Sequence, residues 1–199
     1  MKITKIEQQK KRRDRYSVYI NDEFAFGLGE QQLVELGISK GQEISKQELE
    51  KFLKYSHAGK AYDRAIAMIA RRPRSRKEIR DYLARKDYDE PTIDSVVTKL
   101  IDKELLNDAQ FAKDWVSWRQ ATTPRSRRRL QAELRKKGVD QEEIESALEA
   151  VGHEEELEQI KEIIEKRARN YDSEEKLMAY LARQGYNYDV IRQALDERD

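Results

Sequence analysis

One short phrase occurs twice in this chain of 199 residues, and it constrains the fold more than any other feature. Pro-Arg-Ser-Arg surrounds Ser75 and again Ser126, and both copies continue with apolar residues four and eight positions after the serine. A third frame, without the arginines, starts at Ser173. Self-similarity at a period of roughly 50 residues is typical of a tandem repeat, in which small units stack to bury a continuous core.

The three frames agree at five apolar offsets from the serine, namely 4, 8, 13, 18 and 22 residues. The residues at these offsets are Ile79, Leu83, Tyr88, Ile93 and Val97; Leu130, Leu134, Val139, Ile144 and Leu148; and Leu177, Leu181, Tyr186, Ile191 and Leu195. A serine suits a helix N-cap, and offsets four apart place successive turns on one helix face. Gly138 and Gly185, at offset 12, suit the left-handed residue that ends a helix, although the first frame has Asp87 there.

A further amphipathic segment precedes each serine, at residues 61–72, 108–120 and 157–169. Each unit is therefore predicted to contain three helices, with a tight turn between the second and the third. That arrangement is helix-turn-helix geometry.

The N-terminal segment has a different period. Residues 16–28 alternate apolar and polar on both sides of Asn21-Asp22, which predicts a β-hairpin, and residues 2–7 are a candidate third strand. Ser45 and Glu48 have capping-box spacing and predict a helix start, and Gly59 is predicted to end that helix.

The sequence thus predicts a mainly α fold, a tandem array of three three-helix (helix-turn-helix-like) repeats, elongated and curved, with a small N-terminal β-hairpin. We place the hairpin and its helices at residues 1–58. The repeats are predicted at residues 59–104, 105–152 and 153–199.

Composition narrows the classes of function. The chain has no cysteine, and its two histidines, His57 and His153, lack ligand-like spacing, so neither a metal site nor a thiol nucleophile is predicted. It contains no phosphate-binding loop or other catalytic motif, so a protein without enzymatic activity or cofactor is expected. No apolar run is long enough to span a membrane and no signal peptide is apparent, so a cytoplasmic protein is expected.

The net charge of +1 hides a gradient along the chain. Residues 71–137 carry 19 Lys/Arg against 11 Asp/Glu, whereas residues 138–199 carry 8 against 18. A basic middle indicates either a polyanionic partner or simply solvated helix faces.

The arginines of the repeated phrase are the candidate site. Cations at a helix N-terminus oppose the helix dipole, at a cost of about 0.3–1 kcal/mol each when exposed. Four of them beside each cap favour a reason outside the fold, such as a phosphate or a partner's carboxylate, over mere solubility. The candidate partner- or DNA-binding residues are Arg71, Arg72, Arg74, Arg76, Arg125, Arg127, Arg128, Arg129, Lys136 and Lys137.

Two observations argue against the common classes of DNA-binding protein. Trp115 and Trp118 follow Phe111 at helical spacing, which predicts core packing and not base stacking. The candidate third helices, near residues 90–101 and 140–151, are neutral or acidic, which disfavours sequence-specific recognition of base edges.

The segment Leu105–Arg119, with Leu106, Asn107, Asp108, Phe111 and Ala112 as its signature, resembles the RecX family of bacterial recombination regulators, and so do the Pro-Arg-Ser-Arg segment after it and the three-unit layout. The resemblance implies a protein that binds the RecA recombinase filament and limits its ATPase, strand-exchange and SOS-inducing activity. We expect the protein to be a monomer. It leaves open a direct DNA contact within the filament. The alternative is a helical repeat protein that binds nucleic acid independently.

Overall fold

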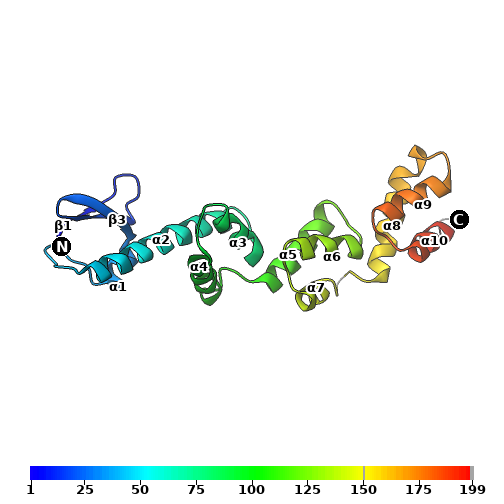
Figure 1. Cartoon of the computed structure of the whole chain (residues 1–199). Coiled ribbons are helices and arrows are strands. Elements are labelled where there is room, and N and C mark those ends of the chain that lie inside the picture. Colours follow the sequence, from blue (N-terminus) through cyan, green and yellow to red (C-terminus); the bar gives the residue numbers. More distant parts are fainter. Residues whose placement is uncertain (150, 198–199) are drawn as a thin grey trace. The chain divides into compact units, whose positions relative to one another are not determined.

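The alternating N-terminal segment forms a three-stranded antiparallel sheet in the order β1-β2-β3 (Figure 1). The strands are β1 Ile3–Gln8, β2 Arg15–Ile20 and β3 Glu23–Gly29. Asn21 and Asp22 have φ values of 49° and 68°, as a two-residue hairpin turn requires. The predicted hairpin and the third strand are therefore both confirmed. The structure, a computed structural model, describes residues 1–149 and 151–197.

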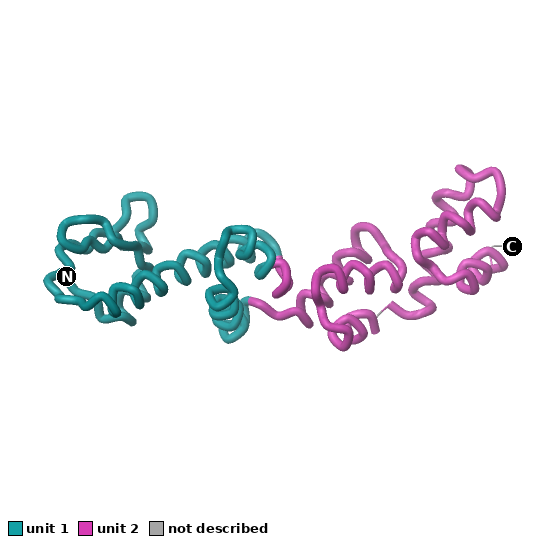
Figure 2. The backbone as a smooth tube through the Cα atoms, in the orientation of Figure 1, with its two compact units in different colours: residues 1–72, 79–105 teal, residues 73–78, 106–199 magenta. Residues whose placement is uncertain are grey.

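The described chain divides into two compact units, drawn in different colours in Figure 2. Unit 1 comprises residues 1–72 and 79–105, and unit 2 comprises residues 73–78 and 106–199. Residues 73–78, which contain the first copy of the repeated phrase, therefore lie in the same unit as the second and third repeats.

Unit 1 contains the sheet, the short helix α1 Glu30–Glu35 and the long helix α2 Lys46–Ile69. Ser45 caps α2 and forms the predicted capping box with Glu48. The sheet packs on α2 through Phe26 and Phe52, whose ring centroids lie 6.0 Å apart. Unit 1 also holds α4 Glu90–Asp102, and α3 Arg76–Ala84 begins in unit 2 and continues into unit 1.

The prediction that Gly59 ends a helix is wrong. Helix α2 continues through Gly59, so the segment predicted as the first helix of repeat 1 is the C-terminal part of α2. A Cβ atom on residue 59 would overlap the side-chain amide of Gln32, which donates a hydrogen bond to the carbonyl of Tyr55 at 2.8 Å. Glycine is present here because another side chain approaches the helix backbone closely.

Unit 2 contains the helices of the second and third repeats. Their bounds are α5 Asp108–Thr122, α6 Arg127–Lys136, α7 Gln141–Ala147, α8 His153–Arg167, η1 Ala168–Asn170, α9 Glu174–Arg183 and α10 Tyr188–Asp196. Helices α5, α6 and α7 share one apolar core, and α8, α9 and α10 share another. This is the predicted mainly helical architecture of tandem three-helix repeats.

The residues at the five predicted apolar offsets form the cores of these repeats. All of them are buried except Tyr88, which is partly buried against the ring of His57. Leu83, Leu134 and Leu181, at offset 8, are completely buried. At offset 12 the backbone is left-handed in every frame, including at Asp87, where φ is 60°. The predicted alignment of the three frames is confirmed.

Candidate partner-binding surface

Each serine of the repeated phrase caps a helix and also contacts the repeat that follows. Within unit 2, Ser75 Oγ donates to the carbonyl oxygen of Lys137 at 2.7 Å, and Ser126 Oγ donates to that of Gln184 at 2.9 Å. Lys137 and Gln184 are equivalent, because each lies 11 residues after the serine of its own repeat, Ser126 or Ser173. Both donor serines are completely buried. The phrase therefore forms a repeated contact, which we call the serine joint.

An acidic side chain of the following repeat completes each serine joint. The backbone N–H of Arg76 donates to Asp108 Oδ1 at 2.8 Å, and that of Arg127 donates to Glu156 Oε1 at 2.6 Å. These carboxylates satisfy N–H groups that the first turn of a helix leaves unpaired. Burial raises the pKa of the Asp108 carboxyl above its ordinary value, and the hydrogen bond from Arg76 offsets part of that effect.

The glycine after each acceptor carbonyl is required for two reasons. Gly138 and Gly185 have φ values of 77° and 93°, in the left-handed region that favours glycine. A Cβ atom on Gly138 would lie 2.6 Å from Cβ of Lys77, and one on Gly185 would lie 2.6 Å from Ser126 Oγ. The glycines therefore end their helices and also make room for the preceding repeat.

Two arginines of the second phrase take part in the fold. The guanidinium of Arg127 donates to the carbonyl oxygens of Leu148 and Val151, the latter at 3.1 Å. Arg129 Nη1 donates to Gln184 Oε1 at 2.6 Å, beside the second serine joint. Arg127 and Arg129 therefore have hydrogen-bond partners within the fold, and their role in partner binding stays a prediction.

Two cations of the first phrase, and Lys137 directly after α6, also have neighbours within unit 2. Lys137 Nζ lies 3.1 Å from Glu78 Oε1 and 4.0 Å from the ring centroid of Trp115, and only 17% of the Lys137 side chain is exposed. Arg74 Nη1 lies 4.0 Å from Glu78 Oε1. Arg76 Nε lies 3.9 Å from the buried carboxylate of Asp108.

The remaining predicted site residues differ in exposure. Arg71 and Arg72 are exposed in unit 1, and Arg128 and Lys136 are exposed on α6 in unit 2. Arg125 is half-buried, and its Nε has no hydrogen-bond partner among the described residues. The structure thus distributes the predicted set between two units and leaves four of its cations most accessible to a partner.

The prediction that both tryptophans pack in the core is wrong for Trp118, which is 50% exposed. Trp115 is partly buried against the core of repeat 2 and donates from Nε1 to Glu133 Oε2 at 2.9 Å. The guanidinium of Arg119 lies 4.9 Å from the Trp115 ring centroid and 4.8 Å from that of Trp118. The sequence does not predict this stack of Arg and Trp side chains, because the helical spacing of apolar residues does not show where the core ends.

The described residues offer no group of three or more His, Cys, Asp or Glu side chains arranged to hold a metal ion. A membrane-crossing helix is also absent from the described part of the chain, where no helix combines the necessary length and apolarity.

Comparison with known proteins agrees with this arrangement along the chain. The model of the regulatory protein RecX N-terminal domain matches residues 1–45. Models of the first, second and third three-helix domains of RecX match residues 61–100, 107–148 and 154–195.

Individual relatives extend over nearly all of the chain. The regulatory protein RecX of Halalkalibacterium halodurans is 35% identical over 202 residues, covering 96% of this chain and 76% of the relative. That of Caldanaerobacter subterraneus is 33% identical, covering 98% and 99%. A crystal structure of regulatory protein RecX matches with a TM-score of 0.83 and 27% identity over 98% of each chain. The protein described here therefore belongs to the RecX family of regulatory proteins.

Proposed function

We propose that this protein binds the filament that RecA recombinase forms on single-stranded DNA and restrains the filament's ATP hydrolysis, strand exchange and SOS-inducing activity. The proposal rests on the match of all four RecX segments along the chain, together with relatives named regulatory proteins that match over nearly all of this chain. A regulator of this kind acts by binding, and it needs accessible side chains more than a catalytic centre.

The exposed cations of the candidate surface are the side chains that we assign to this binding. Arg128 lies in the first turn of α6, where its charge opposes the helix dipole and adds nothing to helix stability. Lys136 is exposed at the other end of the same helix. Carboxylates of the recombinase or phosphates of the filament DNA are the chemical groups that such cations bind.

Variants of these two residues test the proposal. Arg128→Gln combined with Lys136→Gln should weaken inhibition of the RecA ATPase on single-stranded DNA while leaving the melting temperature unchanged. The matched control is Lys176→Gln combined with Arg183→Gln in repeat 3, which removes the same charge from exposed positions of α9. Normal inhibition by the first variant would exclude this surface, and failure of the unaltered protein to inhibit would exclude the function.

The second candidate, an independent nucleic-acid-binding protein, is favoured by the excess of cations in residues 71–137. Binding that depends on phosphate contacts weakens steeply with salt. Tight binding to single-stranded DNA without recombinase at ~0.15–0.2 M salt would favour this candidate, because purely electrostatic contacts are weak under those conditions.

A further inference from the structure

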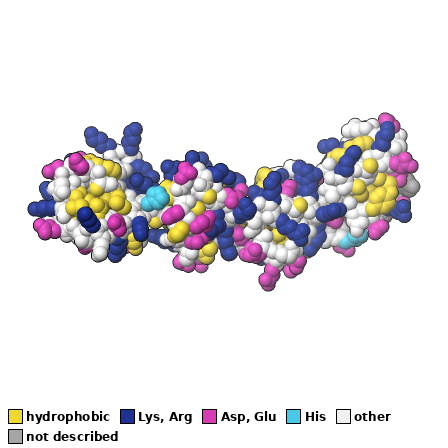
Figure 3. Space-filling view, in the orientation of Figure 1, with side chains coloured by type: hydrophobic (Ala, Val, Ile, Leu, Met, Phe, Trp, Pro, Cys, Tyr) yellow, Lys and Arg dark blue, Asp and Glu magenta, His cyan; other side chains and the backbone are white. Residues whose placement is uncertain are grey.

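The connection between β1 and β2 carries four consecutive cations, Lys10, Lys11, Arg12 and Arg13, which are not among the residues assigned above. Lys and Arg side chains project from this part of unit 1 in the space-filling view (Figure 3). Lys10, Lys11 and Arg13 are exposed, and no ion pair links any of them to another described residue within 4 Å. We call these three side chains the basic tip.

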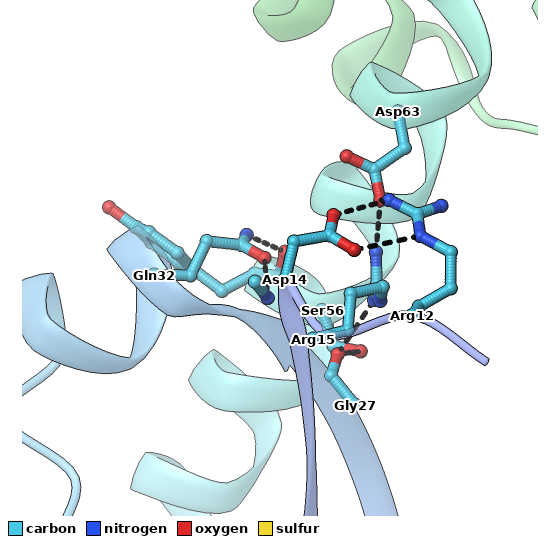
Figure 4. A network of polar contacts seen from close by, with 9 residues as sticks. Arg12, Asp14, Arg15, Gly27, Gln32, Ser56 and Asp63 are labelled. Carbon is cyan, nitrogen blue, oxygen red and sulfur yellow. Dashed lines mark hydrogen bonds and ion pairs between the residues drawn. The ribbon is translucent and has the colours of Figure 1, made fainter. Parts of the chain in front are cut away.

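The base of this connection is fixed to α2 by a network of charged groups (Figure 4). Arg12 donates from Nε and Nη2 to the carboxylate of Asp14, at 3.1 and 2.6 Å, and Nη2 lies 3.2 Å from Asp63 Oδ2. Arg15, which is buried, donates to the same oxygen of Asp63 and to the carbonyl of Gly27 at 3.1 Å. Carboxylates of unit 1 therefore pair with Arg12 and Arg15, whereas no described carboxylate lies within 4 Å of a cation of the basic tip.

Hydrogen bonds also fix the backbone around the basic tip. Gln8 Nε2 donates to the carbonyl of Arg13 at 2.6 Å, and the backbone N–H of Gln9 donates to the carbonyl of Arg15 at 2.8 Å. The N–H of Arg15 donates to the carbonyl of Arg12 at 3.0 Å. The fold thus holds three like charges close together, which is unfavourable for the isolated protein. A connection ordered in advance loses less conformational entropy when it binds a partner.

We infer that the basic tip binds the phosphate backbone of DNA. Residues 9–14 include no apolar side chain, whereas protein–protein interfaces centre on apolar and aromatic groups. Contacts between cations and consecutive phosphates need no apolar surface and carry no sequence information. The inference places a direct DNA contact on unit 1. It rests on the proposed function in one respect, because the proposed function identifies the bound DNA as the DNA of the recombinase filament.

The test is binding of the full-length protein to a fluorescently labelled oligothymidine, without recombinase, measured by anisotropy at several salt concentrations. The variant replaces Lys10, Lys11 and Arg13 with Gln. Each phosphate contact to a single strand contributes about 0.7 to the slope of log K against log salt, so the slope should fall by about 2. The Kd should rise at least roughly tenfold at ~0.05 M salt.

The matched control replaces Lys46, Lys51 and Lys54, three exposed lysines of α2, with Gln and removes the same charge from unit 1. It should bind DNA as the unaltered protein does. Equal losses in both variants would overturn the inference, because net charge alone would then explain binding.

Two further outcomes would also overturn the inference. One is a full-length protein that does not bind the oligonucleotide even at ~0.05 M salt, where phosphate contacts are strong. The other is a basic-tip variant that binds DNA normally and no longer sediments with RecA filaments, which would assign the tip to a protein contact. Because the DNA assay contains no recombinase, its result is independent of whether the protein inhibits the RecA ATPase.

Discussion

The contact between Ser126 and Gly185 allows one serine joint to be tested through a single pair of atoms. A Cβ atom on residue 185 would lie 2.6 Å from Ser126 Oγ, and the next nearest atom beyond its chain neighbours lies at 3.7 Å. Gly185→Ala therefore clashes chiefly with the serine hydroxyl. Ser126→Ala removes that hydroxyl, so the two substitutions should be strongly non-additive.

The magnitudes follow from the contacts that each substitution removes or creates. Ser126→Ala loses a helix cap, at about 1 kcal/mol. It also leaves the carbonyl of Gln184 without its donor, at about 1–3 kcal/mol. Gly185→Ala places an L-residue in the left-handed region, at about 1–2 kcal/mol. Gly185→Ala also overpacks the site against Ser126 Oγ, at a cost of about 1–3 kcal/mol. Only this overpacking cost disappears in the double variant, because Ser126→Ala removes the hydroxyl. The double variant should therefore be about 1–3 kcal/mol more stable than the sum predicts.

Urea unfolding followed by tryptophan fluorescence measures these free energies, because both tryptophans lie on α5 in unit 2. The control is Gly37→Ala, at a φ of 61° with no atom within 4 Å of the new Cβ, combined with Ser126→Ala. The free-energy changes of these two substitutions should add. The unfolding of the Gly37→Ala variant is measured by circular dichroism. Additivity within about 0.5 kcal/mol for Ser126 and Gly185 would refute the serine joint.

Three further predictions concern single substitutions. Leu134→Ala should destabilise unit 2 by about 2–5 kcal/mol in the same urea titration, because the side chain is completely buried. Arg127→Gln should lower the melting temperature, since its guanidinium donates to two backbone carbonyls, whereas Arg128→Gln should leave it unchanged or slightly raised. The raised pKa of Asp108 means that the folded state binds this proton more tightly than the unfolded state. The contribution of Asp108 to stability should therefore decline as pH rises from the ordinary Asp range through the raised pKa. Melting temperatures between pH ~3 and ~7 should show this decline in the unaltered protein and not in Asp108→Asn.

The repeat architecture could be predicted because its signals are local and recur. Apolar offsets at helical spacing indicate which face of each helix is buried, and the structure buries that face in all three frames. The left-handed residue at offset 12 has a local signal as well, namely glycine in two frames. The same conformation at Asp87 was not predicted, although Asp tolerates it better than most residues.

The features that could not be predicted depend on contacts between distant segments. Gly59 has the local character of a helix stop, but the approach of Gln32 explains it. Arg127 and Arg129 bond to groups 21 and 55 residues away, which no local spacing indicates. Trp118 continues the apolar face of α5 in sequence, yet no residue of that helix after Val116 contributes to the buried core of repeat 2. Partners of this kind become visible only once the repeats are packed.

Co-sedimentation with RecA filaments on single-stranded DNA tests the central claim most directly. At ~0.15–0.2 M salt, where phosphate contacts alone are weak, the protein should enter the pellet with the filaments in a saturable manner. It should stay in the supernatant with the same DNA when recombinase is left out. A protein that stays in the supernatant with filaments, or that pellets equally with DNA alone, would contradict the assignment of this chain as a regulator that acts on the recombinase filament.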